Sequence, residues 1–244
     1  MTHSEPLTLI DHIRELRRRV IWSAAAILLG TMACYWFYDR IVVVLMRPFH
    51  LGQPGVTALY INSLFEGFAT KIRFSVIAGV MITIPIHLYH LIRFILPGLS
   101  HKEQKVVGWA LFSSAILSAI SLYLGYFYFI PSAIRVLIGN DFIPKGVGLL
   151  LNFNQNVFYV VNFLLYGMLT FQLPILLEIL LYLNVLSRKT LLRHSRFAIL
   201  VIFIISAIVT PTPDVINQLF IAVPLLLFYF SALLIAYIFK FGEG

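Results

Sequence analysis

Long runs without a charged residue dominate the chain, and short stretches that contain Lys, Arg, Asp or Glu separate them. A helix needs roughly 20 mainly apolar residues to cross about 30 Å of hydrocarbon. Most of the uncharged runs reach that length, so the pattern predicts membrane-spanning helices. The predicted helices cover approximately 20–38, 64–95, 106–131, 157–183, 197–210 and 215–239.

The fifth predicted helix is short. It stops before Pro211, which leaves about 15 residues, or roughly 22 Å at 1.5 Å per residue. A helix of that length requires local thinning of the bilayer or a neighbouring element that covers its end. The predicted fold class is therefore all-α: a single integral membrane domain over residues 1–244, polytopic, with six transmembrane helices.

The Lys and Arg residues predict the orientation of these helices. If the N-terminus is inside, the cytoplasmic segments hold twelve Lys and Arg residues and the outer segments hold at most six. Cytoplasmic segments of membrane proteins carry the excess of these residues. We therefore expect both termini in the cytoplasm.

Composition supports the same class and excludes others. The chain is 60% hydrophobic and 11% charged, which is too little charge to cover a soluble domain of 244 residues. The net charge of +8 lies in short clusters between apolar runs, so it predicts contact with membrane lipid and not with nucleic acid. The single cysteine, Cys34, excludes an internal disulfide. His87 and His90 have no evident third ligand, so we expect no metal site.

Three charged or proline-containing segments stand out beside the apolar runs. Residues 12–19 read His-Ile-Arg-Glu-Leu-Arg-Arg-Arg, and on composition alone they predict a charged turn that anchors the first helix at the headgroups. Residues 46–48 read Met-Arg-Pro, where the proline could simply break a helix. The second helix ends with Leu88-Tyr89, Phe94, Pro97 and Leu99, and Glu103 follows.

Taken in order, these segments resemble the TatC family, the multi-spanning subunit of the twin-arginine protein translocase. The family pattern begins H-x-x-E-L-R-x-R, continues with an outer x-P, and ends its second helix like L-Y-x-x-x-x-F-x-x-P-x-L-x-x-x-E. The chain matches this pattern, and further family positions, at His12, Glu15, Leu16, Arg17, Arg19, Pro48, Leu88, Tyr89, Phe94, Pro97, Leu99, Glu103, Gly125, Tyr126, Phe127, Pro131, Phe171, Pro174, Thr210, Pro211, Pro213, Asp214, Val215 and Gln218. The resemblance covers the whole chain.

The resemblance implies a function in protein export. Such a protein binds twin-arginine signal peptides at the cytoplasmic face of the cell inner membrane and is the scaffold of an oligomeric complex. Its implied partners are TatA- and TatB-like single-span proteins, and folded cargo crosses by means of the proton-motive force. It is not an enzyme and needs no cofactor. The signal-binding residues that carry over are Glu15, Leu16, Arg17, Phe94 and Glu103.

The chemistry of the signal agrees with these positions. Carboxylates hold a guanidinium group best, in bidentate geometry, and the cytoplasmic segments near helix ends offer only Glu15, Glu103 and Glu178. Phe94 would pack against apolar residues of the signal. Arg17 is expected to orient a glutamate rather than touch the signal, because like charges repel.

Other polar positions have a structural and a functional interpretation. Gln172 stands where the family commonly has a membrane-buried glutamate, so it either forms an interhelical hydrogen bond or contacts a partner helix. Asp214 and Gln218, four residues apart, either cap and pack the sixth helix or contact a partner. Pro48 and Tyr126 are expected to be structural.

Two other function classes would require residues of a different kind. A small-molecule or ion secondary transporter would place charged residues near mid-membrane, whereas the deep polar residues here are neutral Gln172 and Asn162. An intramembrane protease would need a Ser–His pair or two aspartates within the bilayer, and the sequence offers neither. The transporter remains the alternative to the translocase subunit.

Overall fold

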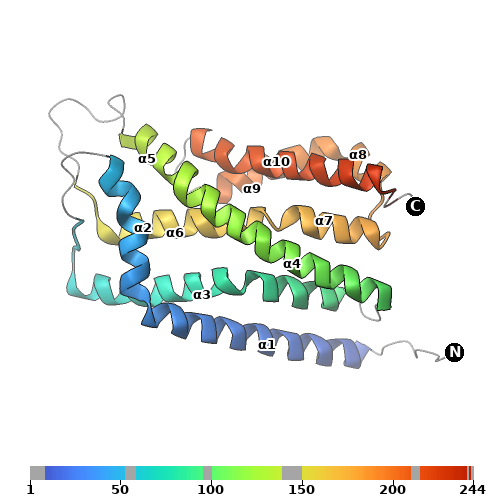
Figure 1. Ribbon diagram of the computed structural model, residues 1–244, viewed down its shortest axis with the longest axis horizontal. Helices are drawn as coiled ribbons and strands as arrows, with labels where there is room; N and C mark the ends of the chain where they lie inside the picture. The colour runs from blue at the N-terminus through green and yellow to red at the C-terminus, as the bar shows by residue number, and fades with distance from the viewer. Residues whose placement is uncertain are drawn as a thin grey trace.

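The computed structural model describes residues 9–52, 59–95, 101–138, 150–209, 215–240 and 242. Most of its helices run lengthwise and side by side (Figure 1): α1 (Leu9–Trp36), α3 (Leu64–Ile95), α4 (His101–Leu124), α6 (Phe153–Thr170), α7 (Leu173–Tyr182), α9 (Ser195–Val209) and α10 (Val215–Ile238). We call the end where α1 begins and α10 ends the terminal end. The opposite end, which α2 (Tyr38–Gly52) crosses, is the far end.

Five stretches in the described part of the chain are long and apolar enough to cross a membrane: Ile13–Trp36, Leu64–Phe94, Gly108–Arg135, Phe153–Tyr182 and Ile221–Ile238. The shorter α9 occupies the place of the predicted fifth helix. The all-α membrane fold is thus confirmed. The count of six spans and the side on which the termini lie stay predictions.

The third predicted helix, 106–131, is too short at both ends. The helix begins at His101 and continues through the π-helical stretch η1 (Gly125–Phe129) into α5 (Ile130–Ile138). Within this stretch the N–H of Ile130 donates to the carbonyl of Gly125, five residues back. The wider π turn lets the helix pass Pro131, whose missing N–H would otherwise interrupt the ladder.

The fourth predicted helix, 157–183, is broken in the middle. Pro174 has no N–H to donate to the carbonyl of Thr170, so α6 ends there and α7 begins at Leu173. Phe171 and Gln172 form the turn between the two helices. A short helix, α8 (Arg188–Arg193), then leads into α9.

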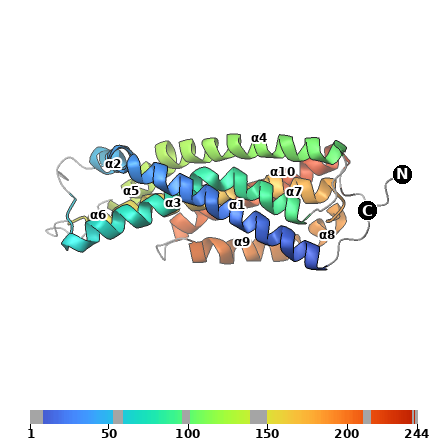
Figure 2. The same cartoon turned by 90° about the horizontal axis from the view of Figure 1, so that it is seen from below.

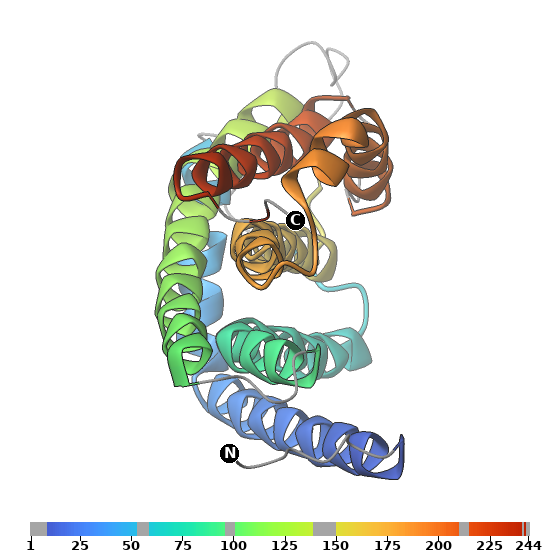
Figure 3. The same ribbon diagram turned by 90° about the vertical axis from the view of Figure 1, so that its right-hand side faces the viewer.

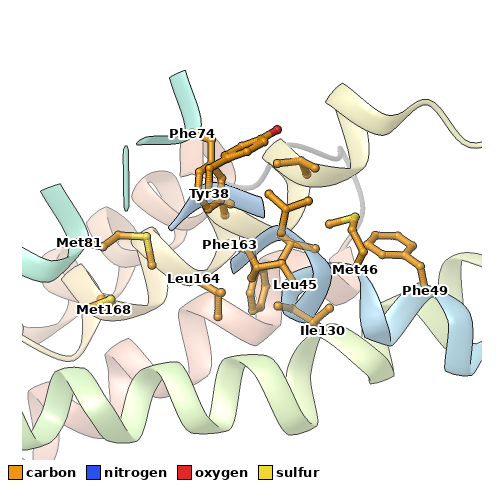
Figure 4. Packing of buried hydrophobic residues seen from close by; sticks show 14 of the residues in the cluster. Tyr38, Leu45, Met46, Phe49, Phe74, Met81, Ile130, Phe163, Leu164 and Met168 are labelled. Carbon is orange, nitrogen blue, oxygen red and sulfur yellow. The ribbon is translucent and has the colours of Figure 1, made fainter. Parts of the chain in front are cut away.

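The largest apolar core lies toward the far end, and α2 supplies much of it (Figure 4). This helix buries one face against α5 and α6, meets α3 at its first residue, and leaves charged residues such as Arg40 exposed. The Tyr38 and Phe74 rings meet edge to face, with centroids 5.3 Å apart. The residues that α2 contributes to this core are Tyr38, Val42, Leu45, Met46 and Phe49.

In a view along the helices, α7 lies in the middle of the bundle (Figure 3). Seen along the helices, α4 runs down one side of α3, α7 and α10 (Figure 3), and contacts with α3, α6 and α7 confirm its position. A perpendicular view places α4 and α9 on opposite sides of the bundle (Figure 2). The pair α1 and α3 forms one edge of the bundle.

Candidate functional site

The pair α1 and α3 is held together by a close crossing of two glycines. A Cβ atom on Gly79 would lie 2.6 Å from the backbone nitrogen of Thr31, and one on Gly30 would lie 3.0 Å from the carbonyl oxygen of Gly79. Small residues of this kind let membrane helices approach backbone to backbone. The crossing therefore fixes the position of α1 against α3.

Between this crossing and the terminal end, α1 and α3 line a cleft of about 330 Å³. Its walls are mainly apolar, with polar groups near the terminal end. The lining residues are Leu16, Arg19, Val20, Ser23, Ala24 and Ile27 from α1, and His87, His90, Leu91 and Phe94 from α3.

Charged groups meet at the mouth of this cleft. An Arg19 Nη2 hydrogen is donated to Glu15 Oε1, one helical turn away, and both side chains are largely buried, at 15% and 29% exposure. Nη1 of Arg19 lies 3.5 Å from the carbonyl oxygen of His90 on α3. Arg19 Nε is buried without a hydrogen-bond partner among the described residues. Glu15 keeps Oε2 as an acceptor for a further donor.

Of the predicted site residues, the structure brings Leu16 and Phe94 together as lining of the cleft and places Glu15 at its mouth. Arg17 is exposed on α1 and does not line the cleft. The arginine that holds Glu15 is Arg19, so the orienting role expected of Arg17 belongs to its neighbour two residues on. The spacing Glu15–Arg19 could have revealed this pair, because residues four apart meet on one helix face.

Two other carboxylates were predicted beside Glu15. Glu103 falls in the first turn of α4, and its side chain lies outside the described residues. Glu178 lies on α7, is partly buried, and is not part of the cleft lining. Sequence reasoning missed that His87 and His90 line this cleft, because only the tertiary fold sets these histidines beside α1.

Pro48 and Tyr126 are joined through one backbone carbonyl. Pro48 lies inside α2, where its missing N–H cannot serve the carbonyl of Val44, four residues earlier. The hydroxyl of Tyr126, from η1, donates to this carbonyl over 2.6 Å. Tyr126 thus supplies the hydrogen bond that Pro48 removes, which gives both residues a structural role.

Gln172 faces the inside of the bundle. Only 7% of it is exposed, and its Oε1 accepts a hydrogen bond from the hydroxyl of Ser114 on α4. Its amide donates to Ser118 Oγ at 3.0 Å and to the Met168 carbonyl at 3.3 Å. The geometry therefore supports the interhelical packing role, and a contact of Gln172 with a partner helix stays a prediction.

Gln218 also bonds within the chain. Its amide donates to the carbonyl of Phe203 over 3.0 Å, which ties α10 to α9. Asp214, predicted to act with it, lies outside the described residues.

Comparisons with known proteins find relatives over almost the full length. The family model "Sec-independent protein translocase protein (TatC)" matches residues 11–224. A Sec-independent protein translocase protein TatC from Carboxydothermus hydrogenoformans is 32% identical, over 95% of this chain and 93% of its own. One from Koribacter versatilis is 31% identical, over 95% and 86%. A crystal structure of the twin-arginine translocase receptor TatC superposes with a TM-score of 0.80 at 29% identity, covering 92% of this chain and 98% of its own.

Proposed function

This chain belongs to the TatC family of Sec-independent protein translocase proteins, and on that premise we propose that it receives twin-arginine signal peptides in the cleft between α1 and α3. The observation that supports this proposal most directly is that a partly buried carboxylate, Glu15, lies beside an apolar cleft at the terminal end. A twin-arginine signal offers the complementary pair of groups, guanidinium followed by apolar side chains.

The charged mouth of the cleft would bind a signal arginine, and its apolar walls would bind the apolar residues of the signal. A signal arginine binds Glu15 through Oε2 while Arg19 keeps Oε1, because a carboxylate has acceptor sites for both donors. Arg19 thereby holds the carboxylate in position. Leu16, Val20 and Phe94 then contact the apolar residues that follow the arginines. A volume of about 330 Å³ suits a few side chains, so cargo domains stay outside the cleft.

Glu103 is proposed as the second carboxylate of the same site. It lies in the first turn of α4, which follows α3 in the chain after residues 96–100. Each signal arginine would then have its own carboxylate, an arrangement that favours two adjacent guanidinium groups over a single one.

We also propose the membrane in which this site lies and the side that it faces. The protein is a multi-pass membrane protein, and we infer that it lies in the cell inner membrane with both termini in the cytoplasm. The bias of Lys and Arg toward the segments of the terminal end supports this orientation. There it would assemble with TatA- and TatB-like single-span proteins, and export would draw on the proton-motive force.

Signal-peptide binding by a Glu15→Gln variant tests the proposal. Charge-assisted hydrogen bonds contribute about 1.5–3 kcal/mol, so affinity for a labelled twin-arginine peptide should fall roughly 10- to 150-fold. Glu178→Gln is the matched control, since it removes a partly buried carboxylate that does not line the cleft. A loss below about threefold for Glu15→Gln, with the protein folded, would place the arginine site elsewhere.

A further inference from the structure

A second hollow lies between α3 and α6 in the half of the bundle toward the far end. It is an open groove of about 600 Å³, well separated along α3 from the cleft at the terminal end. We call it the α3–α6 groove. Its lining comprises Ile72, Arg73, Val76 and Ile77 from α3, and Asn154, Gln155, Phe158 and Asn162 from α6.

Arg73 fixes the depth of this groove in the membrane. Along α3 it stands twenty residues, or about 30 Å of helix, from Arg93 at the terminal end. This length matches the thickness of the hydrocarbon core. With Arg93 at one membrane surface, the exposed Arg73 therefore lies at the other, level with lipid headgroups.

Polar and apolar residues of the lining lie at different depths. Arg73, Asn154 and Gln155 lie near the far end beside Ile72; Val76, Ile77 and Phe158 follow one turn further in, and Asn162 lies deepest. No described residue forms an ion pair or hydrogen bond with the Arg73 side chain, and the lining contains no Asp or Glu. Lys71, two residues earlier, is directed to the rings of Tyr35 and Tyr38 instead.

One polar atom of the groove, at the level of the lipid headgroups, has no hydrogen-bond partner among the described residues. This atom is Asn154 Oδ1, which is buried. A buried carbonyl oxygen without a donor costs free energy, so the arrangement favours a ligand that brings one. The groove thus presents a free guanidinium for an anion, an acceptor for a hydroxyl or ammonium group, and an apolar stretch of wall one turn below both.

We propose that the α3–α6 groove binds one phospholipid. Its phosphodiester rests on Arg73, a polar headgroup donor reaches Asn154, and the start of one acyl chain lies along Val76 and Phe158. The groove spans only two turns of α6 from Gln155 to Asn162, about 10 Å, whereas a membrane-spanning partner helix would need about 30 Å of contact. The length and the charge of the groove therefore favour a lipid over a partner helix.

Lipid retention by the purified protein tests this proposal. Delipidated protein is mixed with phosphatidylglycerol, or with a diacylglycerol of the same chains that lacks phosphate, and bound lipid is counted by native mass spectrometry. The wild type should retain one phosphatidylglycerol about tenfold more strongly than the diacylglycerol, and Arg73→Gln should remove this preference. Arg40→Gln, which removes an exposed cation of α2 outside the groove, should keep it. Equal preference in wild type and Arg73→Gln would overturn the proposal.

A photo-crosslinker at Phe158, activated in native membranes, identifies the occupant directly. Adducts with the mass of a phospholipid support the proposal, and they should diminish when Arg73→Gln is combined with the crosslinker. Adducts with protein alone would contradict it and assign the groove to a partner helix or to the signal peptide.

Discussion

The two ends of the bundle satisfy their polar groups in different ways. At the far end, hydrogen bonds join segments that are distant in sequence. Glu66 on α3 accepts from the side chain of Asn152, 86 positions away, at 2.9 Å, in addition to a local bond from the backbone N–H of Asn62 at 2.6 Å. The backbone of Tyr60 exchanges hydrogen bonds with residues 151 and 153, at 3.0 and 2.8 Å. Tyr126 completes the broken ladder of α2.

At the terminal end, α8 is also tied to a segment distant in sequence, because the Arg188 guanidinium donates to the carbonyls of Ala236 and Tyr237 at the end of α10, both at 3.3 Å. In the cleft between α1 and α3, however, the charged pair is local. Glu15 and Arg19 pair within one turn of α1, and their link to α3 is a 3.5 Å contact with a carbonyl. Glu66 and Tyr126 at the far end are thus used by the fold, whereas Glu15 in the cleft keeps capacity for a ligand. We therefore expect substitutions of Glu66 or Tyr126 to change stability, and substitutions in the cleft to change binding.

The largest effect is expected where both ends depend on the same contact, at the crossing of α1 and α3. Gly79→Val would drive a side chain into the backbone of Thr31, and overpacking of this kind costs about 1–3 kcal/mol or more. Thermal unfolding in detergent should show a marked loss, with signal binding lost as well. Gly108→Val, at a position with open space around it, is the control and should unfold like the wild type. A stable, binding-competent Gly79→Val would show that the crossing does not form.

An intermediate effect is expected at Gln172, midway between the ends. Gln172→Leu removes the bonds to Ser114 and Ser118, so stability should fall by about 0.6–2 kcal/mol while partner association is retained. Gln172→Glu should leave transport nearly unchanged between pH 6 and 8. A carboxyl group buried in this setting stays neutral, so it can still accept from Ser114 and keep one of the two bonds that the amide donates. Transport that rises in Gln172→Glu and becomes pH-dependent would instead assign this position to proton coupling.

A smaller effect, with a characteristic rescue, is expected at the far end. Tyr126→Phe leaves the Val44 carbonyl without its donor and should cost about 0.5–1.5 kcal/mol. Pro48→Ala restores a backbone N–H to the same carbonyl, so Tyr126→Phe should cost less in that background. Unfolding of the two single variants and the double variant forms the cycle. Strictly additive losses would mean that Pro48 and Tyr126 act independently.

The sequence predicted the long helices well because their signal is local. The second predicted helix, 64–95, has the bounds of α3, since a long apolar run there ends at charged and proline-rich segments. By contrast, α2 was not predicted. It has only 15 residues, and its buried face is recognisable only once α5 and α6 are in place to cover it. Pro174 marks the break between α6 and α7. The break was not predicted, because the uninterrupted apolar run around Pro174 favoured one continuous helix.

In the candidate site, too, the features with a local sequence signal were predicted and those that depend on tertiary contacts were not. Glu15, Leu16 and Phe94 came from motif positions, and the structure sets all three at one cleft. The partner of Glu15 was visible as a four-residue spacing. The contact of Arg19 with the carbonyl of His90 joins residues 71 positions apart, and no spacing rule reaches that far.

Photo-crosslinking of a twin-arginine signal peptide tests the contrast between the two ends most directly. The reporter is placed either at Val20, which lines the cleft, or at Phe65, an exposed aromatic residue in the first turn of α3 at the far end. We predict adducts from Val20 that an unlabelled twin-arginine peptide competes away, and none from Phe65. A twin-lysine peptide should form no adducts with Val20. Adducts from Phe65 in the absence of adducts from Val20 would contradict this prediction.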